Sequence, residues 1–164
     1  MDYLDITSIN NDNENQNQGN QDIELVKNVK GFKIVNYNIG GIGENFDEIE
    51  TLLNESDPKK KFHVLQICES WLSNNSRKQN ISVEGYSYIR KDRPLNKKKK
   101  GGGLVVYYCD FLDIDFDDYI NDWVSGDDLE LMYYKVKSRD ASDIFILSIY
   151  RPPTSKLTVL CLEL

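Results

Sequence analysis

The chain has 164 residues, of which 40% are hydrophobic and 29% are charged, a balance typical of one soluble globular domain with its own core. No stretch reaches the roughly 18 consecutive apolar residues of a membrane helix, and the N-terminus is acidic and polar where a signal peptide would be basic and then apolar. These features exclude a membrane or secreted protein and predict an intracellular one, nuclear or cytoplasmic. With three widely spaced cysteines and one histidine, the chain offers neither a disulfide framework nor a zinc site.

Residues 1–30 are rich in Asn, Gln and Asp, and they carry too little apolar surface to offset the entropy of ordering them. We therefore expect a disordered tail over residues 1–30 and a single domain over residues 31–164.

Short apolar runs separated by polar turns follow from Phe32 onward. Their length and their content of β-branched and aromatic residues predict strands over residues 32–39, 62–68, 86–90, 103–109, 129–136 and 143–150. Between the first two, Phe46, Ile49, Leu52 and Leu53 recur at helical spacing and predict one helix. The opening is then β-α-β, while the later strands follow one another too closely for helical crossovers and must be largely antiparallel. A mixed α/β sandwich is the fold class that this order predicts.

Charge is unevenly distributed, although the formal net charge is −7. Residues 87–101 carry seven Lys or Arg against one Asp, whereas residues 110–130 carry nine Asp or Glu and no basic residue. Phosphate binding depends on a local basic face, so the overall acidity does not exclude nucleic acid. Each block is also compatible with a solvated loop.

Within the acidic block, residues 112–122 alternate apolar and acidic side chains, a pattern typical of a half-buried edge strand. As a calcium-binding loop starting at Asp113 this stretch fails. Asp118 stands where glycine is needed, and Val124 stands where a bidentate glutamate is needed.

The corner between the first strand and the helix contains Gly40, Gly41 and Gly43. A dinucleotide-binding fingerprint needs another glycine where Phe46 stands, and Glu44 would place a negative charge where the pyrophosphate should lie. No Lys-Ser or Lys-Thr pair follows to complete a P-loop. These glycines are therefore interpreted as the turn from strand to helix.

Several further pieces occur in a recognisable order. The first strand ends at Asn38, the next runs into Glu-Ser-Trp-Leu at residues 69–72, and YSYIRKDR, Gly-Gly-Gly and Tyr-Arg-Pro-Pro follow at residues 86–93, 101–103 and 150–153. This order resembles the endonuclease/exonuclease/phosphatase superfamily, most closely the apurinic-endonuclease-like domain that accompanies reverse transcriptase in non-LTR (LINE-type) retrotransposons. The resemblance implies a DNase I-like two-sheet α/β sandwich, of which this chain carries the N-terminal part.

The resemblance also implies roles for single residues. Glu69 matches the principal Mg²⁺ ligand, Asn38 a member of the active-site hydrogen-bond network, and Tyr150 a residue whose hydroxyl lies beside the scissile phosphate. One carboxylate suits Mg²⁺, a hard ion that keeps several waters. Arg90 and Arg93 are candidate contacts to nucleic acid. Structural roles remain open for all of them: a carboxylate at a helix start, a cap, a packing tyrosine and a solvated loop.

The resemblance also identifies what the sequence lacks. Members of the family continue through an Asp-x-Asn element and a Ser-Asp-His element, and neither occurs here. The only histidine, His63, lies in a predicted strand. We therefore expect a truncated Mg²⁺-dependent DNA endonuclease domain that is inactive alone, with DNA and its own missing half as partners and no small-molecule cofactor. The alternative is a non-catalytic remnant that binds nucleic acid.

Overall fold

The computed structural model describes residues 5–9, 27, 30–73, 80–93, 101–117, 130–139 and 141–151. The chain divides into two compact units, Met1–Asp113 and Ile114–Leu164, and each is described by itself. No helix in the described ranges has the length and apolar character needed to cross a membrane.

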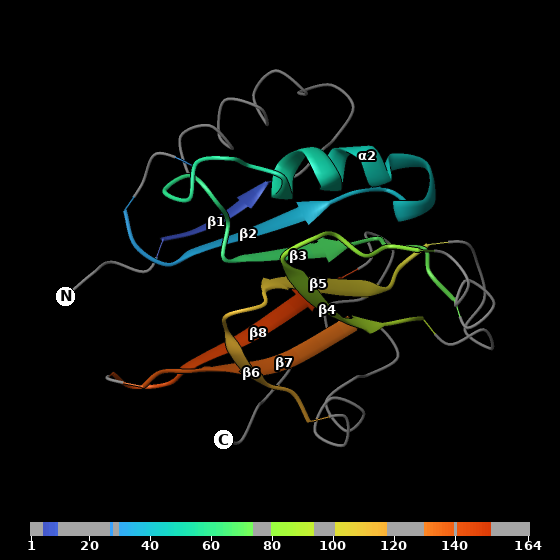
Figure 1. The fold of residues 1–164 in the computed structure, drawn as a ribbon. Coiled ribbons are helices and arrows are strands. Elements are labelled where there is room, and N and C mark those ends of the chain that lie inside the picture. Colours follow the sequence, from blue (N-terminus) through green and yellow to red (C-terminus); the bar gives the residue numbers. More distant parts are fainter. Residues whose placement is uncertain are drawn as a thin grey trace. The chain divides into compact units, whose positions relative to one another are not determined.

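A five-stranded mixed sheet forms the first unit (Figure 1). Its spatial order is β1-β2-β3-β5-β4. β1, β2 and β3 are parallel, while β5 runs antiparallel to both β3 and β4. The bounds are β1 Asp5–Ile9, β2 Lys33–Asn38, β3 Val64–Cys68, β4 Tyr86–Lys91 and β5 Leu104–Cys109. This arrangement confirms the predicted β-α-β opening followed by antiparallel strands.

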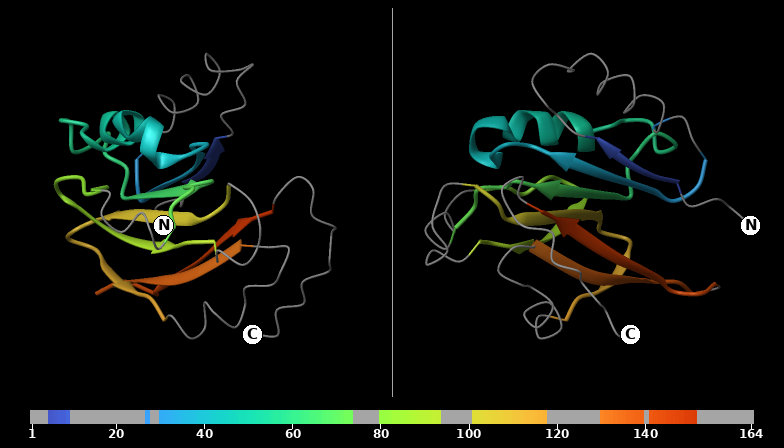
Figure 2. Two further views of the ribbon diagram at one scale, coloured as in Figure 1. Left: turned by 90° about the vertical axis from the view of Figure 1, so that its right-hand side faces the viewer. Right: turned by 180° about the vertical axis from the view of Figure 1, so that it is seen from behind.

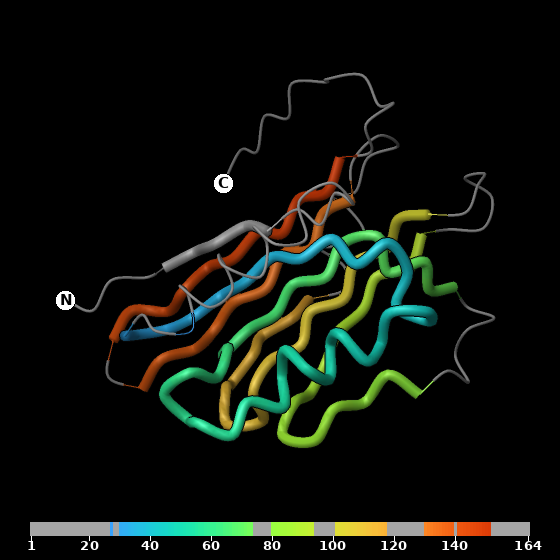
Figure 3. The backbone as a smooth tube through the Cα atoms, turned by 90° about the horizontal axis from the view of Figure 1, so that it is seen from above, coloured from blue at the N-terminus to red at the C-terminus, as the bar shows by residue number. Residues whose placement is uncertain are grey.

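Helix α2, Ile42–Leu53, connects β2 to β3 and runs back over the sheet (Figures 2 and 3). Ile42, Ile49, Leu52 and Leu53 are buried, as their helical spacing predicts. They join one hydrophobic cluster with side chains from the sheet, including Val35, Leu65, Val105 and Tyr107. On its outer flank, Glu48 accepts a hydrogen bond from the Tyr37 hydroxyl at 2.7 Å, which ties the helix to β2.

β1 lies within the segment for which a disordered tail was expected. Asp5–Ile9 pair in parallel with β2, from Asp5 opposite Lys33 to Ile9 opposite Tyr37. The prediction is therefore wrong for these residues: DITSI is rich in β-branched residues, and an existing strand offers them a backbone ladder that composition alone does not reveal. The other residues of that segment, apart from Lys27 and Lys30, lie outside the described part.

The three-stranded sheet has the order β6-β7-β8. Its bounds are β6 Asp113–Asp115, β7 Glu130–Lys137 and β8 Ile144–Tyr150, and β7 and β8 are antiparallel. β6 is the predicted acidic edge strand: Asp113 and Asp115 are exposed on either side of half-buried Ile114. An ion pair of 3.1 Å joins Asp115 to Lys135 of β7. Residues 118–122 of the predicted strand lie outside the described part.

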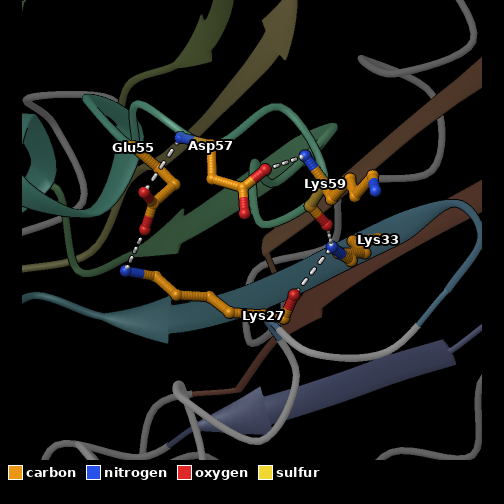
Figure 4. A network of polar contacts seen from close by, with 5 residues as sticks. All are labelled: Lys27, Lys33, Glu55, Asp57 and Lys59. Atoms are coloured by element: carbon orange, nitrogen blue, oxygen red, sulfur yellow. Dashed lines mark hydrogen bonds and ion pairs between the residues drawn. The ribbon is translucent and has the colours of Figure 1, made fainter.

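A buried lysine marks the start of β2 (Figure 4). Lys33 is 2% exposed, and its ammonium donates to the backbone carbonyls of Lys27 and Lys59. Lys27 in turn pairs with Glu55 at 3.2 Å. Burial lowers the pKa of Lys33, and the Asp57 carboxylate offsets part of that effect. The buried charge is thus satisfied by carbonyl oxygens, and it ties three segments together at this end of the sheet.

His63, which was predicted to lie within a strand, immediately precedes β3 and lies beside Lys33. Its Nδ1 accepts a hydrogen bond from the backbone N–H of Lys33 at 3.0 Å, and its ring lies 5.1 Å from that of Phe32. Burial, together with the positive charge of Lys33, lowers the pKa of His63. The folded protein therefore favours a neutral imidazole with its proton on Nε2.

This arrangement predicts a loss of stability in mild acid. The unfolded chain protonates His63 near its ordinary pKa of about 6.5, before the folded chain does. The free energy of unfolding should fall as the pH drops below that value, by at most about 1.4 kcal/mol per pH unit. Urea unfolding between about pH 7.5 and 5.5 measures it. His63→Asn, which keeps an acceptor without a titrating ring, should flatten the slope; an equal slope in both proteins would contradict the assignment.

Candidate active site

Glu69 and Asn38 lie at the carboxyl ends of two neighbouring strands of the five-stranded sheet. Asn38 is the last residue of β2 and stands opposite Cys68, the last residue of the parallel strand β3. Glu69 follows Cys68 directly. The carboxyl ends of adjacent parallel strands thus place an amide and a carboxylate at neighbouring positions, both half-buried. In open α/β sheets, ligands bind at the carboxyl ends of the strands.

Two glycine corners hold the backbone of residues 69–71. On one side, the N–H groups of Gly41 and Ile42 donate to the carbonyls of Glu69 and Ser70 at 2.8 and 3.0 Å. On the other side, the carbonyls of Gly102 and Gly103 accept from Trp71 and Ser70 at 2.8 and 3.1 Å. The amides at the start of α2 therefore bond to the protein's own backbone, and this supports reading the first corner as a turn and not as a phosphate loop.

The Glu69 carboxylate is itself held by two donors. Its Oε2 accepts from the indole Nε1 of Trp71 and from the backbone N–H of Gly102, each at 2.6 Å. Hydrogen bonds of this length to a carboxylate belong to the stronger, charge-assisted class. The side chain at the end of β3 is thus fixed in orientation by groups outside the strand.

Gly101 completes a small cradle around this carboxylate. A Cβ added at Gly101 would lie 3.1 Å from Glu69 Oε2, 3.7 Å from Trp71 Nε1 and 3.8 Å from Arg93 Nη1. Glycine at this position keeps that space open. The acid, the indole N–H and the guanidinium therefore converge on one point beside the backbone.

Asn38 makes a local contact. Its Oδ1 accepts a long hydrogen bond of 3.3 Å from the N–H of Gly40, which supports the turn after β2. It does not cap α2, whose N-cap residue is Gly41 and which has no side-chain cap. The structure therefore does not support a capping role for Asn38.

The two candidate arginines differ in their surroundings. Arg90 pairs with Asp92 through two hydrogen bonds of 2.9 and 2.5 Å and donates to the carbonyl of Ser73 at 3.1 Å. Its charge is thus largely compensated, and it braces the end of the loop that begins at Glu69. Arg93 lies over the Gly101–Gly102 backbone, so that a Cβ at Gly102 would collide with its guanidinium.

Tyr150 lies in the other unit. It ends β8, is half-buried, and stands opposite Glu130 of β7. Pro152 and Pro153, which complete the Tyr-Arg-Pro-Pro motif, lie outside the described residues. The role that the resemblance implies for Tyr150 remains a prediction.

The donor set at Glu69 is small. Across the ranges that the structure describes, no three His, Cys, Asp or Glu side chains cluster as a metal site would require. Mg²⁺, however, is commonly held by one or two carboxylates together with waters and substrate phosphates. One oriented carboxylate, with the Asn38 amide nearby, fits an ion held in that way and not one enclosed by protein ligands.

Sequence reasoning missed the parts that orient Glu69. Trp71 and Gly102 entered only as members of motifs, and neither was assigned a contact to the acid. The spacing of two residues was not a signal for this contact, because Glu69 and Trp71 adopt a left-handed and not an extended backbone. Nothing local pointed to Gly102, which is 33 residues away from Glu69.

Comparison with known proteins identifies the fold. No family model matches the chain, and no curated protein is similar to it in sequence. Among solved structures, the chain is similar to the crystal structure of the AP endonuclease LMAP from Leishmania major, with a TM-score of 0.51 and 15% identity. The match covers 73% of this chain and 40% of that protein. The chain therefore has an incomplete DNase I-like α/β fold, and the predicted fold class is confirmed.

Proposed function

We propose that this chain is the N-terminal part of a Mg²⁺-dependent phosphodiesterase domain of the DNA endonuclease type, derived from a LINE-type retrotransposon and inactive alone. The observation that carries the proposal is the Glu69 carboxylate, which is half-buried at the end of β3 and oriented by the two N–H donors of Trp71 and Gly102. The fold similarity to an AP endonuclease supports the same class of protein.

In this proposal Glu69 would hold Mg²⁺, and water and phosphate oxygens of DNA would supply the remaining ligands. Bound there, the ion would polarise the phosphate and stabilise charge on the leaving oxygen. Arg93, whose guanidinium shares the Gly101 cradle, would contact the same phosphate group. Its positive charge disfavours a cation that binds alone and favours one that arrives together with an anionic phosphate. Arg90 would act indirectly, by bracing the Glu69 loop through Ser73.

The retrotransposon origin rests on the order of the motifs, which is a property of the sequence. The expected inactivity rests on the general base and the charge-stabilising histidine that the resemblance places in a second half. Asn38 would order water and phosphate without competing for the metal, and a role for Tyr150 rests on the resemblance alone.

Glu69→Gln tests the proposal. The wild-type chain should bind Mn²⁺, used as a spin probe for Mg²⁺, and the variant should bind it at least about tenfold more weakly because one ligand charge is lost. Electron paramagnetic resonance measures the dissociation constant, with dimethyl phosphate present in every Mn²⁺ titration to supply the phosphate group that the Arg93 charge requires. Glu84→Gln is the matched control, because Glu84 is an exposed carboxylate in the turn before β4. Wild-type chain should bind plasmid DNA in a salt-sensitive way without nicking it.

The other outcomes separate the alternatives. DNA binding without any Glu69-dependent Mn²⁺ binding would favour the non-catalytic remnant. Nicking that requires Mg²⁺ and is lost in Glu69→Gln would show that the chain is active and would overturn the expected inactivity. Absence of both Mn²⁺ and DNA binding would overturn the proposed function as a whole.

A further inference from the structure

Glu69 and Trp71 share an uncommon backbone conformation. Their φ angles are 56° and 55°, in the left-handed region that side chains other than glycine rarely adopt. Two such residues, separated only by the buried Ser70, form the segment that leaves β3. Strain of this kind persists where the surroundings over-determine the backbone, and it clusters at functional sites.

The consequence of this backbone is a contact between two neighbouring side chains. The indole of Trp71 returns toward the acid two residues before it and donates its Nε1–H to Glu69 Oε2 at 2.6 Å. The indole nevertheless remains 37% exposed. Burial of apolar surface alone therefore does not explain why a tryptophan stands here in a strained conformation.

The backbone of the first glycine corner, at Gly41, packs against the indole ring of Trp71. A Cβ added at Gly41 would lie 2.6 Å from Cε3 and 3.2 Å from Cδ2 of Trp71. Real Cβ atoms do not come so close to a ring, so glycine is what allows the indole to lie against this corner. The Gly41 backbone on one side and the Glu69 carboxylate on the other restrict the orientation of the indole ring.

We propose that Trp71 is a positioning residue for Glu69: its indole N–H, together with the Gly102 N–H, pre-orients the carboxylate before a cation binds. A free glutamate loses rotamer entropy when it is immobilised on an ion, and partners that hold a metal ligand in place commonly change metal affinity by about 10–100-fold. The inference rests on the proposed function for its cation, whereas the clamp itself can be measured without one.

The first measurement needs no metal and leaves Trp71 unchanged. In protein labelled with ¹⁵N-tryptophan, only two indole N–H signals arise, from Trp71 and Trp123, and Trp123→Phe assigns them by the signal it removes. Glu69→Gln should move the Trp71 indole proton upfield and speed its exchange with water, since a carboxylate acceptor is replaced by a weaker amide. Glu84→Gln should leave it unchanged. An indole signal that does not respond to Glu69→Gln would overturn the proposal.

The second measurement is Mn²⁺ affinity by electron paramagnetic resonance. Trp71→Phe keeps an aromatic ring without the N–H and should weaken binding about tenfold. Trp71→His, which retains a ring N–H donor, should recover part of that loss, and simple repacking of the site would not produce such a rescue. Trp71→Phe protein that is folded, as shown by an unchanged circular dichroism spectrum, and binds Mn²⁺ as tightly as wild type would overturn the proposal.

The two measurements also separate the inference from the proposed function. Wild-type protein that binds no Mn²⁺ would contradict the proposed cation site, while the indole signal still decides whether Trp71 holds the acid. If Trp71→Phe fails to fold, the first measurement decides the outcome alone.

Discussion

Replacing Gly103 with alanine should be among the most destabilising single changes at the candidate site. Gly103 has a φ of 88°, and a Cβ there would collide with the hydroxyl of Ser70, which is 1% exposed. Unlike the long Arg93 side chain at Gly102, a short buried serine cannot swing away. We expect a backbone penalty of about 1–2 kcal/mol and a further ~1–3 kcal/mol for overpacking, measured as free energy of unfolding in urea.

Gly85→Ala provides the matched control for this change. Gly85 has a similar φ of 79°, but nothing lies within 4 Å of the position that its Cβ would take. Only the backbone penalty should appear there, so the difference between the two variants isolates the contact with Ser70. Equal destabilisation of both would show that Gly103 is needed for its backbone conformation and not for space beside the Glu69 loop.

Phe62→Ala should cost about 3–5 kcal/mol of unfolding free energy, the range for truncating a buried phenylalanine. The Phe62 side chain is 0% exposed and belongs to the hydrophobic cluster under α2. Its carbonyl also accepts hydrogen bonds from the Tyr86 hydroxyl, at 2.8 Å, and from the Cys109 thiol, at 3.4 Å. A cavity at this point would therefore loosen the contacts that join β3 to β4 and β5. Urea unfolding followed by circular dichroism measures the loss.

Phe111→Ala is the control, because the same change is made at a side chain that is 75% exposed. A loss within about 0.5 kcal/mol is expected there, as for other surface substitutions. A loss at Phe111 as large as the loss at Phe62 would contradict the placement of the core on the α2 side of the sheet.

Both glycine motifs hydrogen-bond to the backbone of residues 69–71. Gly41 and Ile42 bond to the loop from one side, and Gly102 and Gly103 bond to it from the other. Neither corner is used as a phosphate cradle in this arrangement, since their backbone groups are paired with the loop that carries Glu69. The glycines thus serve the acid by close approach of backbone to backbone.

Local patterning was enough to predict most of the secondary structure. Helical spacing from Phe46 to Leu53 defined α2, because its apolar residues must share one face. The short apolar runs gave strands whose bounds fall within a few residues of those observed. The motif order also pointed to the DNase I-like fold, which the similarity to a solved AP endonuclease confirms. These features are carried by residues close together in the chain.

Strand order was not available from the same patterns. β5 pairs between β3 and β4, and β4 takes the sheet edge. The observed burial agrees with this order: β3 is buried along its whole length, whereas β4 is mostly half-buried. β1 could not be predicted, because it pairs with a strand far away in the sequence, with Asp5 opposite Lys33. Its own five residues show no strong periodicity.

For the site, the sequence proposed Glu69 and Asn38 as candidates, whose roles remain predictions, and it could not show what holds them. Glu69 and Trp71 adopt the left-handed conformation although neither is glycine, so the residue types could not predict this backbone. The Gly102 N–H reaches Glu69 only because β3 and β5 are neighbours in the sheet. The sequence also could not show that Arg90 pairs with Asp92 and donates to the Ser73 carbonyl, and its contact with nucleic acid remains a prediction. Residue types are local information, whereas the orientation of a carboxylate depends on donors that only the folded chain brings to it.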